Sequence, residues 1–227
     1  MKIVLINASP RKNGATAKIL TEFANRLRLC ENTDVTLFHL SEINPEYCKG
    51  CCVCYKTGEC FIKDDVEMLS RTIGESDGLI IGTPCYASNV SGQLKTLIDR
   101  GHFIFEQLLK GKHTVGVVTY ENAESGAAFK VLKKLFLFSG AKSTDRLIVK
   151  LPFNSDPFAD EKLKIKIETK SNNLYKAILK NKSYNFMDKI MHFFVFNFGI
   201  KPFVIRKGEL YSGILMQWEK GGILRRN

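Results

Sequence analysis

The chain has 227 residues, 44% of them hydrophobic and 25% charged, a composition typical of a globular protein with one sizeable core. Of the formal net charge of +11, residues 160–227 contribute +8 (14 Lys and Arg against 6 Asp and Glu), and because no nucleic-acid-binding motif accompanies them, we expect a solvated basic face and no nucleic acid partner. No apolar run approaches the roughly 18 residues of a membrane span, and the N-terminus lacks a signal-peptide pattern, so a cytoplasmic protein is predicted.

Five short apolar segments have the length and residue types of β-strands, and helical patterns alternate with them. The strand segments are residues 2–6, 34–38, 78–82, 114–119 and 146–149. The helical patterns cover residues 15–29, 64–76, 93–100 with 103–109 as a continuation, 127–138 and 160–180. Because parallel strands need helical crossovers, this alternation predicts an α/β fold with a five-stranded parallel sheet covered by helices on both faces.

The pattern changes beyond residue 151, and we expect residues 156–227 to form a helical, aromatic-rich extension of a domain that spans residues 1–155. Residues 186–205 are dense in Phe, Met and Ile, but His192 and Asn197 interrupt a run already too short to span a bilayer. Such a segment is typical of core packing or of an oligomer interface, and docking on a membrane surface is the less favoured alternative. A homodimer or tetramer is therefore expected.

The first predicted strand runs into a polar loop, residues 7–16, that opens a helix. Backbone N–H groups at a helix N-terminus lack intrahelical acceptors and carry partial positive charge, so such a loop suits a phosphate. The side chains expected to bind it are Ser9, Arg11, Asn13 and Thr16. The loop has neither glycine pattern of nucleoside triphosphate or dinucleotide sites, which favours a single terminal phosphate, with an ordinary capped strand-turn-helix as the alternative.

A second polar loop, residues 83–93, follows the third predicted strand. Pro84 stiffens its turn, Tyr86 offers a flat aromatic face, and the serines near its end supply polar groups. A surface loop whose Ser91 caps the next helix is the alternative. Because ligands of such sheets bind beyond the carboxyl ends of the strands, the two loops together predict a ligand with a phosphate at one end and planar rings at the other, as in FMN.

These two loops carry a family resemblance. The pattern Ser9-Pro10-Arg11-x-x-Gly14-x-Thr16, with Thr83-Pro84-x-Tyr86, VSGQLK at residues 90–95 and IDR at 98–100, resembles the NAD(P)H-dependent FMN reductase and iron-sulfur flavoprotein branch of the flavodoxin-like superfamily over about residues 1–150. The resemblance implies a flavodoxin-like three-layer sandwich and a bound FMN. It places the phosphate on the four loop residues given above and the ring beside Pro84, Cys85, Tyr86, Ala87, Asn89 and Val90. The third loop, residues 121–126, departs from the glycine-rich form of many relatives.

Cysteines at a regular spacing form the most specific motif of the chain. The pattern is Cys48-x-x-Cys51-x-x-Cys54-x5-Cys60. One compact loop can point four soft ligands at a single centre, as a [4Fe-4S] cluster requires. A zinc ion held by four thiolates and a set of free or redox-active thiols are the two alternatives, whereas structural disulfides are not expected in the cytosol.

The resemblance implies an enzyme, an FMN-dependent oxidoreductase that takes electrons from NAD(P)H and passes them to a small acceptor such as a flavin or quinone, directly or through a cluster at the four cysteines. The sequence contains no catalytic triad or carboxylate pair, so we expect the chemistry to be flavin-borne, with no catalytic side chain. A non-enzymatic electron carrier between redox proteins is one alternative, and a thiol- or metal-sensing protein is another.

Overall fold

A five-stranded, wholly parallel sheet forms the centre of the computed structural model, which describes residues 1–43, 45–122 and 125–224. Its strands are β1 (Lys2–Asn7), β2 (Asp34–His39), β3 (Gly78–Pro84), β4 (His113–Tyr120) and β5 (Lys142–Lys150). The strand order is β2-β1-β3-β4-β5, so the chain reverses its direction of winding between β1 and β3. This arrangement confirms the expected α/β fold with a parallel sheet.

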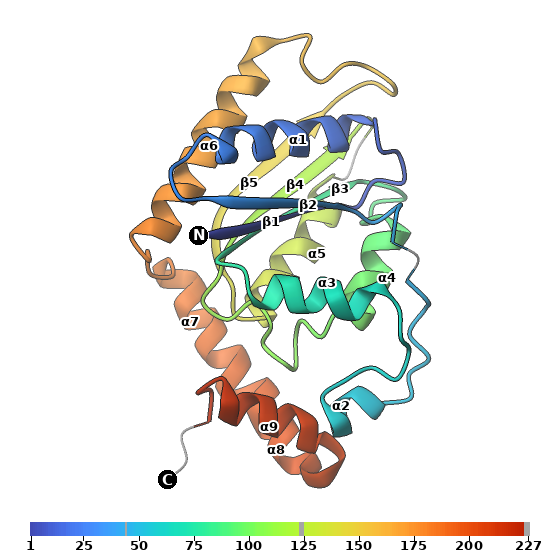
Figure 1. Cartoon of the computed structure of the whole chain (residues 1–227), viewed down its shortest axis with the longest axis vertical. Coiled ribbons are helices and arrows are strands. Elements are labelled where there is room, and N and C mark those ends of the chain that lie inside the picture. The colour runs from blue at the N-terminus through green and yellow to red at the C-terminus, as the bar shows by residue number, and fades with distance from the viewer. Residues whose placement is uncertain (44, 123–124, 225–227) are drawn as a thin grey trace.

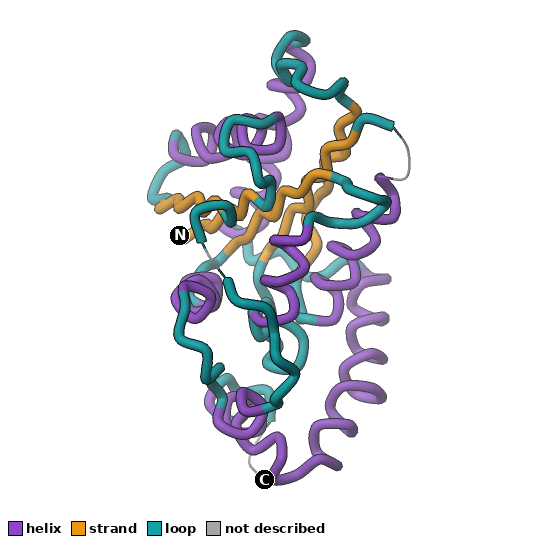
Figure 2. The backbone as a smooth tube through the Cα atoms, turned by 90° about the vertical axis from the view of Figure 1, so that its right-hand side faces the viewer, coloured by secondary structure: helices purple, strands orange, loops and turns teal. Residues whose placement is uncertain are grey.

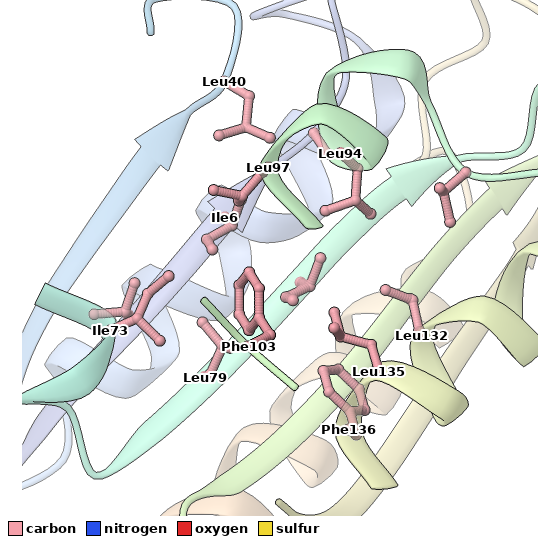
Figure 3. Close-up of a cluster of buried hydrophobic side chains, with 14 of the residues drawn as sticks. Ile6, Leu40, Ile73, Leu79, Leu94, Leu97, Phe103, Leu132, Leu135 and Phe136 are labelled. Carbon is pink, nitrogen blue, oxygen red and sulfur yellow. The ribbon is translucent and has the colours of Figure 1, made fainter. Parts of the chain in front are cut away.

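Helices cover both faces of the sheet, as Figure 1 shows. The helices α1 (Ala15–Arg28) and α6 (Glu161–Leu179) lie on one face, and α3 (Asp65–Gly74), α4 (Gly92–Arg100) and α5 (Ser125–Phe138) lie on the other. Successive residues of a strand point to opposite faces, so Leu5 packs with α1 and α6 while Ile6 belongs to the core beneath α3, α4 and α5, drawn in Figure 3. The three layers therefore form a flavodoxin-like sandwich.

The helix α6 belongs to this sandwich, because its Ile167 and Leu174 are buried in the same core cluster as α1. It lies within residues 156–227, which the sequence predicts as an extension. The domain boundary at residue 155 stays a prediction, and the part of the chain that leaves the sandwich begins after α6.

The expected continuation of the helix at residues 93–100 over residues 103–109 is wrong. The helix α4 ends at Arg100, and residues 101–111 form a series of turns. The backbone of His102 is left-handed, with φ +56°, and a Cβ on Gly101 would lie 2.4 Å from the ring of Phe103. The sharp turn carries Phe103 into the core, where it is fully buried, and this burial overrides the helical spacing of the segment.

The C-terminal segment descends from the end of α6 and returns beside α2 (Val53–Thr57), as Figures 1 and 2 show. It consists of α7 (Phe186–Phe194), a π-helical stretch (Val195–Ile200), α8 (Lys201–Lys207), a 3-10 turn (Gly208–Tyr211) and α9 (Ser212–Lys220). Its own small core includes Val204, Ile214 and Trp218, all fully buried. Among the described residues, no helix is both long and apolar enough to cross a bilayer. The final residues of the basic tail, 225–227, lie outside the described part.

Candidate functional site

The larger cavity opens at the carboxyl edge of the sheet, where the winding reverses between β1 and β3. Its volume is about 700 Å³, within the range of ligand pockets. Four segments wall it, each leaving the carboxyl end of a strand: residues 11–18, 84–88, 119–122 and 151–155. The location follows the general rule for open α/β sheets, and the first two segments are the loops that the sequence singled out.

The N-terminus of α1 opens into this cavity without a side-chain cap. Gly14 occupies the N-cap position, and the first turn contains no acidic residue. By contrast, side-chain oxygens of Asp64, Ser91, Asp160 and Asn185 cap α3, α4, α6 and α7. An uncapped helix start leaves N–H groups in need of an external acceptor, so this end of the cavity fits an anion such as a phosphate.

Two of the four predicted phosphate ligands lie in the cavity wall, and the other two lie behind it. Arg11 and Asn13 line the cavity. Ser9 is buried, and its Oγ accepts a hydrogen bond of 3.2 Å from the backbone N–H of Arg11. The Thr16 hydroxyl is also buried and is hydrogen-bonded to the Thr119 hydroxyl at 2.7 Å. In this structure Ser9 and Thr16 therefore shape the loop from behind.

The segment after β5 contacts Arg11, and no sequence motif indicated this contact. The Arg11 guanidinium lies 4.4 Å from the centre of the Phe153 ring, and its Nη1 donates to Oδ1 of Asn154. Its Nε is buried and has no hydrogen-bond partner among the described residues. Arg11 thus retains a donor for a ligand. The sequence position of residues 151–155 could have indicated this contact. They directly follow the fifth predicted strand, and the carboxyl ends of all strands in a parallel sheet lie at the same edge.

The second loop makes a tight turn at the other side of the cavity. Tyr86 and Asn89 exchange two backbone hydrogen bonds of 2.9 Å, and the residues between them, Ala87 and Ser88, are both left-handed, with φ +46° and +61°. Pro84, Cys85, Tyr86 and Ala87 line the cavity, and the Tyr86 side chain is partly exposed. The turn therefore presents an aromatic side chain at the edge of the cavity.

Two predicted ring contacts, Asn89 and Val90, lie outside the cavity wall. The Asn89 side chain accepts a hydrogen bond of 2.8 Å from the N–H of Val90, whose own side chain is buried in the core. Next to them, Ser91 caps α4 and donates from Oγ to the carbonyl of Ala8 at 2.6 Å. These residues fix the second loop against the first. Of the third loop, Glu121 and Asn122 line the cavity, and residues 123–124 lie outside the described residues.

All four cysteines of the regular motif line a second cavity of about 250 Å³. Cys48 and Cys51 are exposed, and Cys54 and Cys60 are partly buried. Burial, with smaller contributions from Glu106 and the neighbouring cysteines, raises the pKa of the Cys54 thiol to about 12. Within the described part of the chain, no three His, Cys, Asp or Glu side chains converge on one metal position. The donor set suits a thiolate-bound centre, and the loop would have to draw its thiols together around it.

A single buried side chain, that of Arg100 on α4, ties together both ends of the cysteine loop. Its Nη1 donates to the carbonyl of Glu46 at 3.0 Å, and its Nη2 donates to the carbonyl of Ile62 at 3.4 Å. It also pairs with the Asp64 carboxylate and lies 3.6 Å from the Cys60 sulfur. The IDR pattern at residues 98–100 marks Arg100 in the sequence but does not indicate this role. The guanidinium holds the loop closed and places positive charge beside a candidate ligand.

The cysteine cavity also has an ionisable pair in its wall that no motif indicated. His102 Nδ1 lies 3.0 Å from a carboxylate oxygen of Glu106, and both side chains are largely buried. Burial alone would lower the pKa of His102, but the hydrogen bond and charge of Glu106 outweigh it, so the pKa of His102 lies above its ordinary value.

The C-terminal helices hold the segment that carries Cys54. The rings of Tyr55 and Tyr211 stack with centroids 4.7 Å apart. Gln217 donates to the carbonyl of Gly58 at 2.9 Å, and Trp218 donates from its indole nitrogen to the carbonyl of Phe105 at 2.8 Å. The aromatic-rich extension thus packs against the cysteine loop and holds it in place. The two cavities share no lining residue.

Comparison with known proteins agrees with this arrangement. The model of the family described as NADPH-dependent FMN reductase matches residues 1–153. An iron-sulfur flavoprotein of Clostridioides difficile strain 630 is 40% identical over 226 residues, which are 99% of this chain and 100% of that protein.

Solved structures show the same fold at low sequence identity. The FMN-dependent NADH-azoreductase of Bacillus anthracis, solved in complex with FMN, is similar with a TM-score of 0.60 and 14% identity over 77% of this chain and 99% of that one. Flavodoxin 1 of Bacillus cereus is similar with a TM-score of 0.55 and 16% identity over 78% of this chain and 98% of that one. The family match over two thirds of the sequence and the full-length relative together show that the chain belongs to the NADPH-dependent FMN reductase family, a family of FMN-binding oxidoreductases.

Proposed function

We propose that the chain binds FMN in the larger cavity and catalyses electron transfer from NAD(P)H to a small acceptor such as a flavin or quinone. The observation that carries this proposal is the uncapped N-terminus of α1, which opens into a cavity at the reversal point of a flavodoxin-like sheet and faces a turn that carries Tyr86. Membership of the FMN reductase family supports it independently.

In this proposal the side chains bind and orient the cofactor. The N–H groups of α1 and the free Nε of Arg11 hold the phosphate, and Phe153 and Asn154 keep the guanidinium in place. Pro84, Tyr86 and the left-handed Ala87 flank the ring system. FMN, when bound, supplies the hydride and electron chemistry, so no side chain needs to act as a general acid or base.

We propose further that Cys48, Cys51, Cys54 and Cys60 hold a [4Fe-4S] cluster. Their common cavity and the Arg100 donor beside Cys60 support this assignment, and the name of the Clostridioides difficile relative is in line with it. Such a cluster carries single electrons. Ligation would also stabilise Cys54 as a thiolate, overcoming the burial that otherwise favours its protonated form.

A second candidate is a non-enzymatic carrier that relays electrons between redox proteins. The separation of the two cavities favours it, because one partner could approach the exposed Cys48 and Cys51 while another approaches the flavin. Nicotinamide oxidation discriminates between the two functions. A reductase is reduced by NADPH or NADH within seconds, whereas a carrier is reduced by a ferredoxin-like protein and hardly at all by either nucleotide.

The proposal also includes a cytoplasmic location and an oligomeric state. None of the seven cysteines, all of them described, is in a disulfide, which supports a place in the reducing cytoplasm. We also propose a homodimer or tetramer, as expected from the sequence. Sedimentation as a monomer at micromolar concentration would refute the oligomer.

The most direct test is the absorption spectrum of protein purified without oxygen, combined with analysis of iron, sulfide and zinc. Bands of oxidised flavin and about four iron and four sulfide per chain are expected. Absence of flavin, with no binding of added FMN, would overturn the flavin assignment. Zinc in place of iron and sulfide would overturn the cluster while leaving the flavin assignment intact.

A further inference from the structure

A continuous apolar stripe runs along the outer side of α7, the π-helical stretch and α8. Its largest members are strongly exposed: Phe186 by 75%, Phe194 by 56% and Phe198 by 70% of their accessible surface. Other exposed apolar side chains on these helices are Met187, Ile190, Met191, Phe193 and Ile205. No residue of α7 is buried. Single exposed apolar residues are normal, but a contiguous patch of this size indicates an interaction surface.

Three aromatic rings in the middle of the stripe touch each other. Phe194 and Phe198 stack with centroids 5.5 Å apart, and Phe193 meets Phe194 edge to face at 5.8 Å. Phe186, Ile190, Phe194 and Phe198 recur every four residues, the spacing of one helix face. The contact across the π-helical stretch keeps Phe198 beside Phe194, so the face continues from α7 toward α8.

The opposite side of these helices is fixed to the protein. Ile200 and Val204 are buried in the C-terminal core, and His192 Nδ1 lies 3.0 Å from the carbonyl of Leu137 on α5. The helices therefore cannot turn the stripe inward without losing these contacts. These helices pack their inward side on the protein's own C-terminal core and present a second apolar side outward.

Charge distinguishes between the occupants that could cover the stripe. Lys189 and Lys201 lie six residues before and six residues after Val195. Arg206 and Lys207 are exposed at the C-terminal end of the stripe. An antiparallel pair of these helices centred near Val195 would bring Lys189 of one copy close to Lys201 of the other. Residues 160–227, which contain the stripe, carry a net charge of +8 in each copy. A second copy is therefore electrostatically disfavoured, whereas an anionic surface is favoured.

We propose that this stripe docks the protein on an anionic lipid bilayer surface. Phe, Met and Ile side chains would enter the interfacial region with the helix lying in the membrane plane, while the flanking Lys and Arg side chains meet the headgroups. Such docking requires no membrane-spanning helix. The inference is independent of the flavin and cluster assignments, because none of the stripe residues lines either cavity.

Vesicle flotation with the full-length, cofactor-loaded protein tests the proposal. We expect the protein to float with vesicles that contain 30% phosphatidylglycerol and much less with pure phosphatidylcholine, and to be released as salt rises. The double variant Phe194→Ser/Phe198→Ser should lower the partition coefficient at least about tenfold, because two large apolar side chains are removed from the bilayer contact. Leu29→Ser is the control, since Leu29 is an apolar residue that is 81% exposed at the C-cap of α1, outside the stripe.

Replacing the flanking charges provides a second arm. Lys189→Glu/Lys201→Glu should abolish the preference for anionic vesicles and leave the flavin spectrum unchanged. Failure of the unaltered protein to bind anionic vesicles would overturn the proposal. So would a change from oligomer to monomer in Phe194→Ser/Phe198→Ser without any change in flotation, because that result would identify a second copy as the occupant.

Discussion

Gly213 on α9 packs directly against Gly58, which ends α2 just after the third cysteine of the motif. A Cβ on Gly213 would lie 2.1 Å from the backbone nitrogen of Gly58, which is shorter than the contacts that Cβ atoms make in proteins. Gly58 itself is left-handed, with φ +84°. Two glycines 155 positions apart thus allow the C-terminal helices to touch the backbone of the cysteine loop.

The variant Gly213→Ala should displace the cysteine loop from α9. The added methyl group meets backbone atoms, which cannot move aside as a flexible side chain would, so we expect a loss of about 1–3 kcal/mol in the free energy of unfolding. In cofactor-free protein, alkylation of the partly buried Cys54 should accelerate several-fold. Urea unfolding and mass-spectrometric alkylation rates measure the two effects. Gly199→Ala, with open space around its Cβ, is the control, and equal effects of both variants would refute the close-packing argument.

The variant Arg11→Ala should weaken FMN binding about 10- to 100-fold, as expected for loss of a charge-assisted hydrogen bond worth about 1.5–3 kcal/mol. Titration of cofactor-free protein with FMN, followed by quenching of flavin fluorescence, measures the dissociation constant. Lys12→Ala is the matched control, because Lys12 is the next residue of the loop but pairs with Glu42 at the surface. A similar loss in both variants would indicate a general charge effect and contradict a specific role for Arg11.

The variant Asp64→Asn should cost roughly 3–5 kcal/mol at pH 7, because it leaves the buried Arg100 guanidinium without its anion. Burial opposes ionisation of Asp64, but hydrogen bonds from Arg100 and from the N–H groups of Glu46 and Val66 outweigh it and hold the pKa below 3.8. The contribution is therefore complete above about pH 4 and is lost as the pH falls through the lowered pKa.

Denaturant unfolding of wild type and Asp64→Asn at pH 7 and pH 3 checks this window, and the difference between the two proteins should shrink at pH 3. The control is Glu75→Gln, which removes an exposed pair with Lys2 and should cost less than about 1 kcal/mol. A difference independent of pH would show that the ionised form of Asp64 is not what stabilises the folded protein.

His113 predicts a second acid-sensitive window. Burial, followed by repulsion from Lys142 and Lys182, lowers the pKa of this histidine to about 4. The unfolded chain, with a histidine pKa near 6.5, then binds more protons than the folded chain between about pH 6.5 and 4, so stability falls as the pH is lowered through this range. The variant His113→Gln should flatten this part of the pH dependence. Unfolding free energies at pH 7, 5.5 and 4 measure it, and identical slopes for both proteins would contradict the assignment.

The sheet and the two loops that line the cavity at its carboxyl edge could be predicted because local patterns specify them. Five apolar segments alternating with helices require a parallel sheet, and the carboxyl ends of parallel strands meet at one edge, which brings residues 11–18 and 84–88 together. The same rule applies to residues 151–155, but their contact with Arg11 depends on where β5 lies in the strand order, and sequence spacing does not encode that order.

The amino-acid sequence by itself determined the fold class, the two polar loops that follow β1 and β3, and the regular spacing of the four cysteines, because each depends on residue type and short-range periodicity. Only the tertiary structure decided that α4 stops at Arg100, that Arg100 closes the cysteine loop, and that Gly213 meets Gly58. These are contacts between segments distant in sequence. They arise because buried polar groups need hydrogen-bond partners and apolar surfaces need close packing, and the complementary groups can lie anywhere in the chain.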